Sequence, residues 1–496
     1  MKKTYLFILA ACTCTFLFSQ EKKLPIDTLV VTQHKTIIKG QTVNYEAQTG
    51  RIPVWNGEGK PIASLFFTYY KRTNISNNTI RPLIFSFNGG PGAGSLWMHM
   101  GYTGPRILKV DSEGYPVQPY GFKSNPYSIL DVADIVFVNP VNVGYSRIIE
   151  YEGKKESGKT FFGVNQDIKY LAEWISTFIS RKNRWDSPKY LIGESYGGVR
   201  VMGLSHELQD KQWIYLNGVI MVSPTDYQVY PGPVASAIDF PYYTAASWYH
   251  KKLPNELQQL DLEEILPKSE EFALTELIPA LSKGGFISDS EKNYIAEKIS
   301  YFTGLNKKDI LQNNINLSTS FFWKELLRDE GKTIGRLDSR YKGIDRQDSG
   351  NRVDYNAEMS AWDHAFTPAI NHYLQNELKF KSDVKYNTWG RNHHSVRPWN
   401  RDNVRVRDNL RQAMAENPFL KVFIQSGYYD GATTYFSAKY TMWQVDPSGK
   451  FKDRFYFKGY RSGHMMYLRQ EDLVKANDDL REFIKNTTTN GKPAKY

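Results

Sequence analysis

The six residues Gly193-Glu194-Ser195-Tyr196-Gly197-Gly198 constrain what this chain can fold into more than any other segment. The apolar stretch 189–192 before them is suited to a buried strand, and 199–207 after them can form a helix. A Gly-x-Ser-x-Gly pattern lets a serine sit in a strained turn between strand and helix with its hydroxyl exposed. Glycines flank Ser195 because side chains there would clash where the backbone doubles back. The segment therefore predicts a nucleophilic serine on a strand–turn–helix unit.

Short apolar runs elsewhere are typical of strands that are buried on both faces of a parallel sheet. They lie at 83–87, 135–138, 190–192, 219–222 and 422–424. Between two of these runs, apolar residues recur at helical spacing over 164–179. Strands that alternate with helices predict an α/β fold with a doubly wound, mostly parallel sheet. β-rich segments on either side of the turn 56–59 predict antiparallel strands at one edge of that sheet.

The long stretch 235–395 carries helical patterns with charged faces. We predict a mainly helical cap there, inserted into the core domain so that it covers the cleft at the carboxyl ends of the strands. The expected division is a signal peptide at 1–20, the first part of the core at 21–234, the cap at 235–395, the second part of the core at 396–485 and a flexible tail at 486–496.

The N-terminus has the layout of a signal peptide, because basic residues at 1–3 precede an apolar run, 6–18, that is too short to span a bilayer. Cleavage near residue 20 would release a mature chain without cysteine, which is unusual for a secreted eukaryotic enzyme and indicates a bacterial protein exported to the periplasm or the medium. The alternative is a lipobox at 9–12, which would make Cys12 a lipid anchor. Both cysteines, Cys12 and Cys14, lie in this segment, so the mature chain would contain no disulfide. No other segment is long and apolar enough to cross a membrane.

The formal net charge is +11, but Lys and Arg are scattered, and no zinc knuckle, RNP-like motif or basic helix occurs, which argues against nucleic-acid binding. The pair His393-His394 is not expected to bind a metal, because adjacent histidines point apart and no carboxylate or cysteine stands at ligand spacing. Trp362-Asp363-His364 is expected to pack rather than to catalyse. No metal or cofactor is predicted, and no pattern indicates an oligomeric state.

A serine hydroxyl becomes a strong nucleophile when a histidine takes its proton and an acid orients that histidine. In α/β hydrolases the three residues follow in the order serine, acid, histidine. Of the nine histidines, only His464 lies beyond the last strong candidate for a parallel strand, and Asp430 directly follows that strand. The predicted triad is Ser195, Asp430 and His464. The alternative acids, in a polar stretch typical of a solvated turn, are Asp446 and Asp453.

The negative charge that develops on an attacked carbonyl oxygen needs hydrogen-bond donors aimed at it. The Tyr196 amide, next after the nucleophile, is one expected donor. The second is expected from a loop after an earlier strand. Asn88-Gly89-Gly90-Pro91-Gly92 follows 83–87 and fits, because glycines permit close approach of the backbone. No Gly-Lys-Ser/Thr follows this loop, so it does not match a phosphate-binding loop.

Six segments taken together resemble the serine carboxypeptidase family of α/β hydrolases, namely 88–95, 102–105, 139–146, 193–198, 427–430 and 463–465. The resemblance runs in order from about residue 40 to about residue 485, over nearly the whole mature chain. It implies the triad named above, with Gly90 and Tyr196 as oxyanion donors. It also implies that Asn88 and Glu194 bind the free C-terminal carboxylate of a peptide substrate.

Glu194 can hydrogen-bond a substrate carboxylate only when it carries a proton, since two ionised carboxylates close together repel. Such a site should favour acidic pH. The alternative role for Glu194 is a buried acid that supports the turn. Two positions depart from the family pattern. Tyr102 stands where many members carry a glutamate that contacts the acid of the turn, and Val138 stands where an acidic residue is frequent, in a loop expected to border the cleft.

The main functional hypothesis is an exported bacterial serine carboxypeptidase that removes a C-terminal residue through an acyl-enzyme, with His464 first as base and then as acid. An esterase or acyltransferase with the same machinery is the first alternative, and the tyrosine at position 102 adds weight to it. A non-catalytic, hydrolase-like binding protein is the second.

Overall fold

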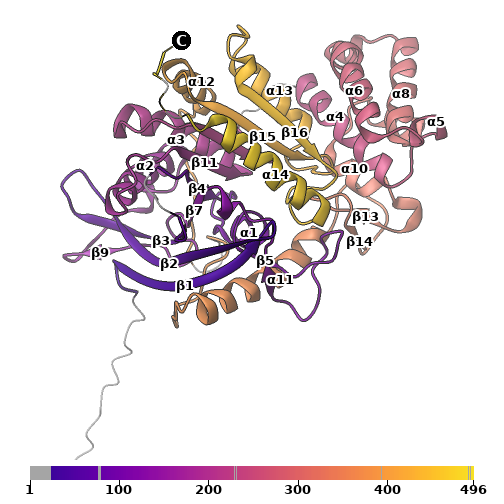
Figure 1. Cartoon of the computed structure of the whole chain (residues 1–496). Coiled ribbons are helices and arrows are strands. Elements are labelled where there is room, and N and C mark those ends of the chain that lie inside the picture. The colour runs from indigo at the N-terminus through magenta and orange to yellow at the C-terminus, as the bar shows by residue number, and fades with distance from the viewer. Residues whose placement is uncertain are drawn as a thin grey trace, which may run out of the picture.

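The computed structural model describes residues 24–75, 80–227, 230, 232–391, 394–489, 491 and 493–495. The predicted signal peptide, Cys12 and His393 lie outside these residues. A central sheet carries helices on both faces, and a second group of helices lies to one side of it (Figure 1).

The central sheet has the strand order β1-β2-β3-β7-β4-β11-β12-β15-β16, with the short strand β8 (Arg147–Ile148) paired to β3. The strands β1 to β3 pair antiparallel at one edge, and every pairing from β7 to β16 is parallel. This arrangement confirms the predicted doubly wound sheet and its antiparallel edge. The bounds are β1 Thr28–Ile38, β2 Gln41–Trp55, β3 Pro61–Arg72, β4 Leu83–Phe87, β7 Asp134–Val138, β11 Lys189–Glu194, β12 Gly218–Val222, β15 Lys421–Gly427 and β16 Phe455–Tyr460.

Burial explains why the central strands are apolar runs, whereas the edge strand alternates. Every residue of β4, β7, β11 and β12 is buried. Side chains of β11 point alternately into two hydrophobic clusters, Tyr190 and Ile192 into one and Leu191 into the other. Exposure alternates along the first half of β1, as expected of an edge strand with one face in water.

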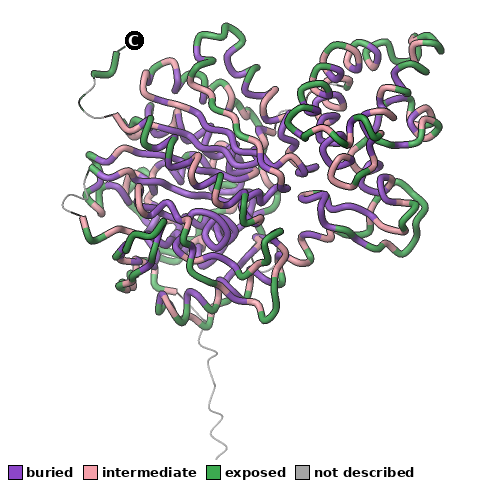
Figure 2. Tube along the Cα trace, turned by 45° about the vertical axis from the view of Figure 1, so that its right-hand side comes forward, coloured by how far each residue is buried: buried purple, intermediate pink, exposed green. Residues whose placement is uncertain are grey.

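Helices cover both faces of the sheet, as Figures 1 and 2 show. One cluster includes residues of α1 (Leu96–Gly101), α11 (Ala357–His372) and α14 (Gln470–Thr487). The cluster on the other face includes residues of α2 (Val164–Arg181), α3 (Tyr196–Gln212), α12 (Val406–Glu416) and α13 (Tyr435–Val445). The predicted helices over 164–179 and 199–207 correspond to α2 and α3.

Residues of the stretch 235–395 occupy two places in the molecule. The helices from α4 to α10 enclose a hydrophobic cluster of their own beside the sheet (Figure 2). In contrast, α11 returns to the sheet, where Trp362 is fully buried and donates from Nε1 to the Tyr341 hydroxyl at 3.0 Å. The bounds of the first group are α4 Gly232–Tyr249, α5 Asn255–Gln258, α6 Leu262–Phe272, α7 Ile278–Ser282, α8 Asp289–Thr303, α9 Lys307–Gln312 and α10 Thr319–Glu325.

Short strand pairs close several loops outside the central sheet. They are β5 Arg106–Leu108 with β6 Phe122–Ser124, β9 Glu150–Tyr151 with β10 Lys154–Lys155, and β13 Thr333–Ile334 with β14 Lys342–Gly343. Within the described ranges, every helix is either too short or too polar to cross a membrane.

Candidate active site

Ser195 occupies the turn between β11 and α3 in a strained conformation. Its φ of +58° and ψ of −120° are rarely adopted by a residue with a side chain. A Cβ atom on Gly193 would collide with the carbonyl group of Gly197, which confirms the reason for the glycines in the motif. The Ser195 amide donates to the Val222 carbonyl at 2.9 Å, so the neighbouring strand β12 fixes the turn.

Asp430 and His464 follow the neighbouring strands β15 and β16, and their side chains meet. His464 Nδ1 lies 2.6 Å from Asp430 Oδ2, and both side chains are buried. Burial opposes a charge on the imidazole, but the adjacent Asp430 carboxylate outweighs it, so the pKa of His464 is raised. Ser195 and His464 line one cavity of about 390 Å³. The structure thus pairs Asp430 with His464 and places His464 at the same cavity as Ser195, at the carboxyl edge of the sheet.

Thr433 is a residue that the sequence analysis missed. Its hydroxyl lies 2.7 Å from Asp430 Oδ2, 3.1 Å from His464 Nδ1 and 2.8 Å from the Ser223 carbonyl oxygen. The amides of Ala432 and Thr433 donate to Asp430 Oδ1 at 2.9 and 3.1 Å. The turn after Asp430 therefore holds the carboxylate in one orientation. Its only sequence signal is a threonine three residues after the acid.

The two alternative acids occupy other places. Asp446 accepts from the Phe451 amide at 2.7 Å and from the Ser448 hydroxyl at 2.6 Å, and so closes a turn. Asp453 lies in a single 3₁₀ turn before β16. Neither is among the described residues that line the cavity.

The loop after β4 packs directly against the serine turn. A Cβ atom on Gly89 would lie 2.7 Å from the Tyr196 amide nitrogen and 2.8 Å from Ser195 Cβ, so only glycine fits there. Gly90 lines the cavity and has a φ of +105°, which again favours glycine. Tyr196 is the first residue of α3, so its amide has no acceptor within the helix. Both predicted oxyanion donors thus lie beside Ser195.

Glu194 also lines this cavity, although it is buried, with 2% of its surface exposed. Asn88 Nδ2 donates to Glu194 Oε2, and the Tyr467 hydroxyl donates to Oε1 at 2.8 Å. Burial raises the pKa of Glu194 to about 7, although His464, Tyr467 and Asn88 favour the ionised form. The predicted pair, Asn88 and Glu194, therefore forms one hydrogen-bonded unit next to the nucleophile.

Tyr102 does not contact Glu194 directly. Its hydroxyl donates to Gln425 Oε1 at 2.7 Å, and its ring stacks on Tyr467 with the centroids 5.0 Å apart. Tyr467 in turn donates to Glu194. A stacked tyrosine pair thus supports Glu194, although the family pattern has a glutamate at position 102. Tyr467 was missed by the sequence analysis, and it follows His464 by three residues.

The loop after Val138 lies behind the cavity wall, so the expectation that it borders the cleft was wrong. None of its residues lines the cavity, and Val138 is fully buried. Asn139 Oδ1 accepts from the Ser95 amide at 3.0 Å and from the Tyr386 hydroxyl at 2.9 Å. The loop therefore supports the segment 88–95 from outside the cavity.

A segment of the predicted cap, 335–340, holds both loops that carry Asp430 and His464. The Leu337 carbonyl accepts from the His464 amide at 2.7 Å, and the Arg336 carbonyl accepts from the Gly431 amide at 3.0 Å. This segment could not be found from the sequence, because no motif marks a backbone contact between distant loops.

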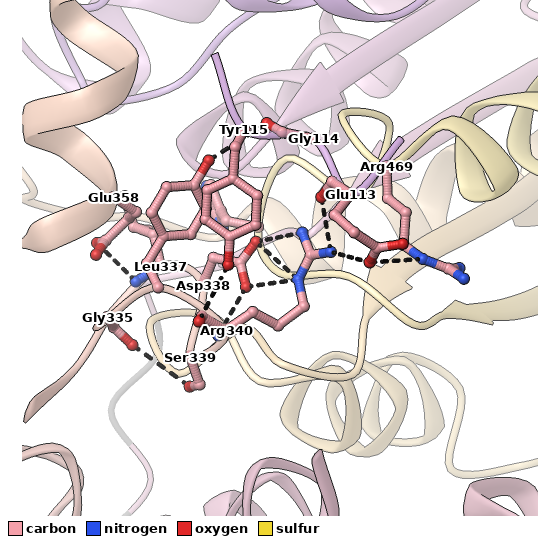
Figure 3. Close-up of polar contacts among 12 residues, drawn as sticks. Glu113, Gly114, Tyr115, Gly335, Leu337, Asp338, Ser339, Arg340, Glu358 and Arg469 are labelled. Atoms are coloured by element: carbon pink, nitrogen blue, oxygen red, sulfur yellow. Dashed lines mark hydrogen bonds and ion pairs between the residues drawn. The ribbon is translucent and has the colours of Figure 1, made fainter. Parts of the chain in front are cut away.

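Two acids fix the segment 335–340 from behind (Figure 3). Glu358 Oε1 accepts from the Leu337 amide at 2.9 Å, and burial raises the pKa of Glu358 to about 7. Asp338 pairs with the Arg340 guanidinium at 2.7 Å, and Arg340 also donates to the Glu113 carbonyl at 3.0 Å. No group of three or more His, Cys, Asp or Glu side chains suited to a metal ion occurs in the described part of the chain.

Comparisons with known proteins agree with this geometry. Serine carboxypeptidase-like 8 of Arabidopsis thaliana is 29% identical over 191 residues, which cover 37% of this chain and 41% of that protein. Serine carboxypeptidase-like 36 of the same plant is 30% identical over 172 residues, which cover 34% and 33%. The matched part of this chain spans less than half the length of these curated relatives.

The solved structure of Kex1(Δ)p, a prohormone-processing carboxypeptidase from Saccharomyces cerevisiae, superposes with a TM-score of 0.54 at 14% identity, over 89% of this chain and 92% of that one. This likeness shows that the chain has the α/β-hydrolase fold. The sequence model that describes serine carboxypeptidases matches residues 38–469, which is most of the chain. This protein therefore belongs to the serine carboxypeptidase family.

Proposed function

We propose that this chain is an exported bacterial serine carboxypeptidase that releases C-terminal residues from peptides. The observation that carries the proposal is the Asn88–Glu194 pair, which lines the same cavity as Ser195 and His464. A neutral acid beside an amide donor can bind a free carboxylate without a repelling charge. An enzyme that cleaves within a chain has no need of such a site next to its nucleophile.

In the proposed mechanism Ser195 Oγ attacks the carbonyl carbon of the last peptide bond while its proton passes to His464 Nε2. Asp430 stabilises the imidazolium through its contact with Nδ1. The oxyanion accepts hydrogen bonds from the amides of Gly90 and Tyr196. The C–N bond then breaks, and the leaving amine takes the proton from His464. Water hydrolyses the Ser195 ester by the same steps, and the shortened peptide leaves as an acid.

The proposed recognition step depends on pH with a defined sign. Because the pKa of Glu194 is about 7, its carboxyl group carries a proton and can donate below that pH. Binding of the substrate carboxylate should weaken as pH rises through about 7. The requirement for a neutral His464 acts in the opposite direction, since its raised pKa lowers the fraction of free base at acidic pH. Together they give a bell-shaped profile of kcat/KM, with acidic pH favouring substrate binding.

We further propose that the predicted signal peptide directs export, on the support of the basic residues at 1–3 and the apolar run 6–18. The stretch 235–395 is proposed to shape the substrate pockets. Among others, it supplies Arg336, Leu337, Met359 and Trp389 to the lining of the cavity.

A fluorophosphonate probe and a pair of peptides test the proposal. The probe should label Ser195, and the variant Ser195→Ala should not react. A dipeptide blocked at its N-terminus should lose its last residue, whereas the same peptide with an amidated C-terminus should be cleaved far more slowly. Equal cleavage of both peptides would remove the exopeptidase assignment. Rapid turnover of simple esters without cleavage of either peptide would favour the esterase or acyltransferase alternative.

A further inference from the structure

The cavity in front of Ser195 has an unbalanced charge. Three arginines, Arg336, Arg391 and Arg397, are among the residues that line it. The only acidic residue among the described lining residues is Glu194, which is buried and has a pKa of about 7. Below that pH the lining therefore carries a net positive charge with no fixed carboxylate to balance it.

The three guanidinium groups are free to meet a ligand. None of them makes an ion pair within 4.0 Å with a described residue, although Arg340, only four positions after Arg336, is buried against Asp338 (Figure 3). The side chains of all three are solvent-exposed. The Arg391 guanidinium lies 4.9 Å from the centre of the Trp389 ring, which limits its motion. Trp389 Nε1 donates to Asp363 at 3.3 Å, and Arg391 favours the ionised form of that carboxyl group, so Asp363 offsets part of the Arg391 charge from behind the lining.

Backbone hydrogen bonds connect the segments that carry these cations to different loops around the reacting groups. Arg336 belongs to the segment whose carbonyls accept from Gly431 and from His464. At the loop after β4, the Gly390 amide donates to the Gly92 carbonyl at 2.6 Å, and the Val396 amide donates to the Gly390 carbonyl at 2.7 Å. Arg391 and Arg397 are the residues next to those two anchors. The backbone at Arg336 and beside Arg391 therefore contacts loops that carry catalytic groups, and Arg397 follows a residue that is anchored to Gly390. These contacts hold the backbone of all three arginines at the cavity.

We propose that these arginines make the enzyme selective for peptides with an acidic side chain, Asp or Glu, at one of the two residues that flank the cleaved bond. Guanidinium groups bind carboxylates through paired, charge-assisted hydrogen bonds, and unpaired cations in a concave site attract anions from solution. A peptide with lysine or arginine at these positions is repelled by the same charges. The inference rests on the proposed carboxypeptidase activity and adds its substrate class.

Peptide pairs that differ only in charge test the proposal. Blocked dipeptides with Glu, Gln or Lys at the last or at the next-to-last position are compared at about pH 6, where a Glu side chain is ionised and Glu194 is still mostly protonated. At low salt, kcat/KM for the Glu peptide should exceed that for the Gln peptide by roughly tenfold at one of the two positions, and Lys should be the poorest. In about 0.5 M salt this ratio should fall several-fold.

The variants Arg336→Gln and Arg391→Gln/Arg397→Gln should each lower cleavage of the Glu peptide more than cleavage of the Gln peptide. The matched variant Arg352→Gln removes an exposed arginine that does not line the cavity, and it should leave the Glu/Gln ratio as in the wild type. Equal cleavage of Glu and Gln peptides at both positions overturns the inference and leaves the carboxypeptidase proposal standing. An equal loss on both peptides in the arginine variants also overturns it, because the arginines would then bind the terminal carboxylate. If the enzyme cleaves none of these peptides, the proposed carboxypeptidase activity itself is ruled out.

Discussion

Two buried glutamates near the cavity have the same raised pKa but different surroundings. Glu194, at the end of β11, and Glu358, in α11 next to the segment 335–340, both have pKa values of about 7 because burial penalises their charge. Glu194 lines the cavity, and both of its oxygens accept from side chains. Glu358 lies behind the wall, where Oε1 holds the Leu337 amide and Oε2 has no hydrogen-bond partner among the described residues.

The difference teaches that a perturbed pKa does not by itself mark a group that touches substrate. Position decides the role. A substrate can reach Glu194, whereas Glu358 can act on the reaction only through Leu337, whose carbonyl holds the His464 amide. We therefore expect Glu194 to control substrate binding and Glu358 to be a positioning residue that mainly affects stability.

Loss of the charge on Asp430 should lower activity far more than loss of a charge elsewhere in the molecule. Asp430→Asn removes the partner that orients His464, so kcat should fall by about 10⁴-fold, as for the orienting acid of other serine triads. Without the carboxylate the pKa of His464 should also fall, because Asp430 is what raises it. The measurement is kcat as a function of pH on an N-terminally blocked dipeptide that has uncharged side chains and a free C-terminus. The matched variant Asp446→Asn should retain most of the activity, and a similar loss in both variants would contradict the assignment of Asp430.

Glu358→Gln should show itself in stability rather than in binding. A raised pKa in the folded state means that folding favours the protonated acid. The resulting stability is present below about pH 4.5 and is lost as pH rises through about 7. The loss amounts to about 3 to 4 kcal/mol at most, since one pKa unit corresponds to about 1.4 kcal/mol. The variant should avoid this loss, because its neutral amide oxygen can still accept from Leu337.

Denaturant unfolding at pH 5 and pH 8 checks the stability prediction. Between pH 5 and pH 8 the wild type should lose more free energy of unfolding than Glu358→Gln does. If the wild type and the variant lose the same free energy over that range, Glu358 does not have a raised pKa in the folded protein.

The parts of this fold that follow from local patterns were predictable. The five central strands, α2 and the turn around Ser195 each depend on residues next to one another, such as the glycines on either side of the serine. Asp430 and His464 could be found because each follows a recognisable strand. The family resemblance added Asn88 and Glu194, which no spacing rule connects.

The residues that support the cavity through long-range contacts, Leu337, Glu358 and Tyr467, could not be predicted from the sequence. Leu337 contacts His464 through backbone atoms, so its side-chain type carries no signal. Glu358 lies on an amphipathic helix, where an acid normally faces water. Tyr467 contacts Glu194 in place of the glutamate that many family members carry at position 102. Its ring is held by stacking on Tyr102, a contact between distant parts of the chain that the sequence does not mark. Contacts between distant segments decide all three.

Glu194→Gln should remove the dependence of binding on pH. In the wild type about a tenth of Glu194 is protonated at pH 8, one unit above its pKa of about 7, so KM should be about tenfold higher than at pH 5. A glutamine amide donates at every pH, so KM of the variant should change little over this range. KM is measured from pH 5 to pH 8 on an N-terminally blocked dipeptide that has uncharged side chains and a free C-terminus. Glu358→Gln is the control and should keep the rise, so a rise in both variants would rule out Glu194 as the titrating group.

The smallest expected effect separates the two stacked tyrosines. The Tyr467 hydroxyl donates to Glu194 and favours its ionised form, so Tyr467→Phe should raise the pKa of Glu194 and move the rise of KM to higher pH. The shift should be less than about one unit, as for loss of a single hydrogen bond.

Tyr102→Phe is the matched control, since it removes the hydroxyl bonded to Gln425 and keeps the ring that stacks on Tyr467. It should lower stability by about 1 kcal/mol and leave the midpoint of the KM profile in place, because its hydroxyl does not touch Glu194. Equal shifts in both variants would mean that the stacked pair acts on Glu194 as a unit, through packing rather than through the one hydrogen bond.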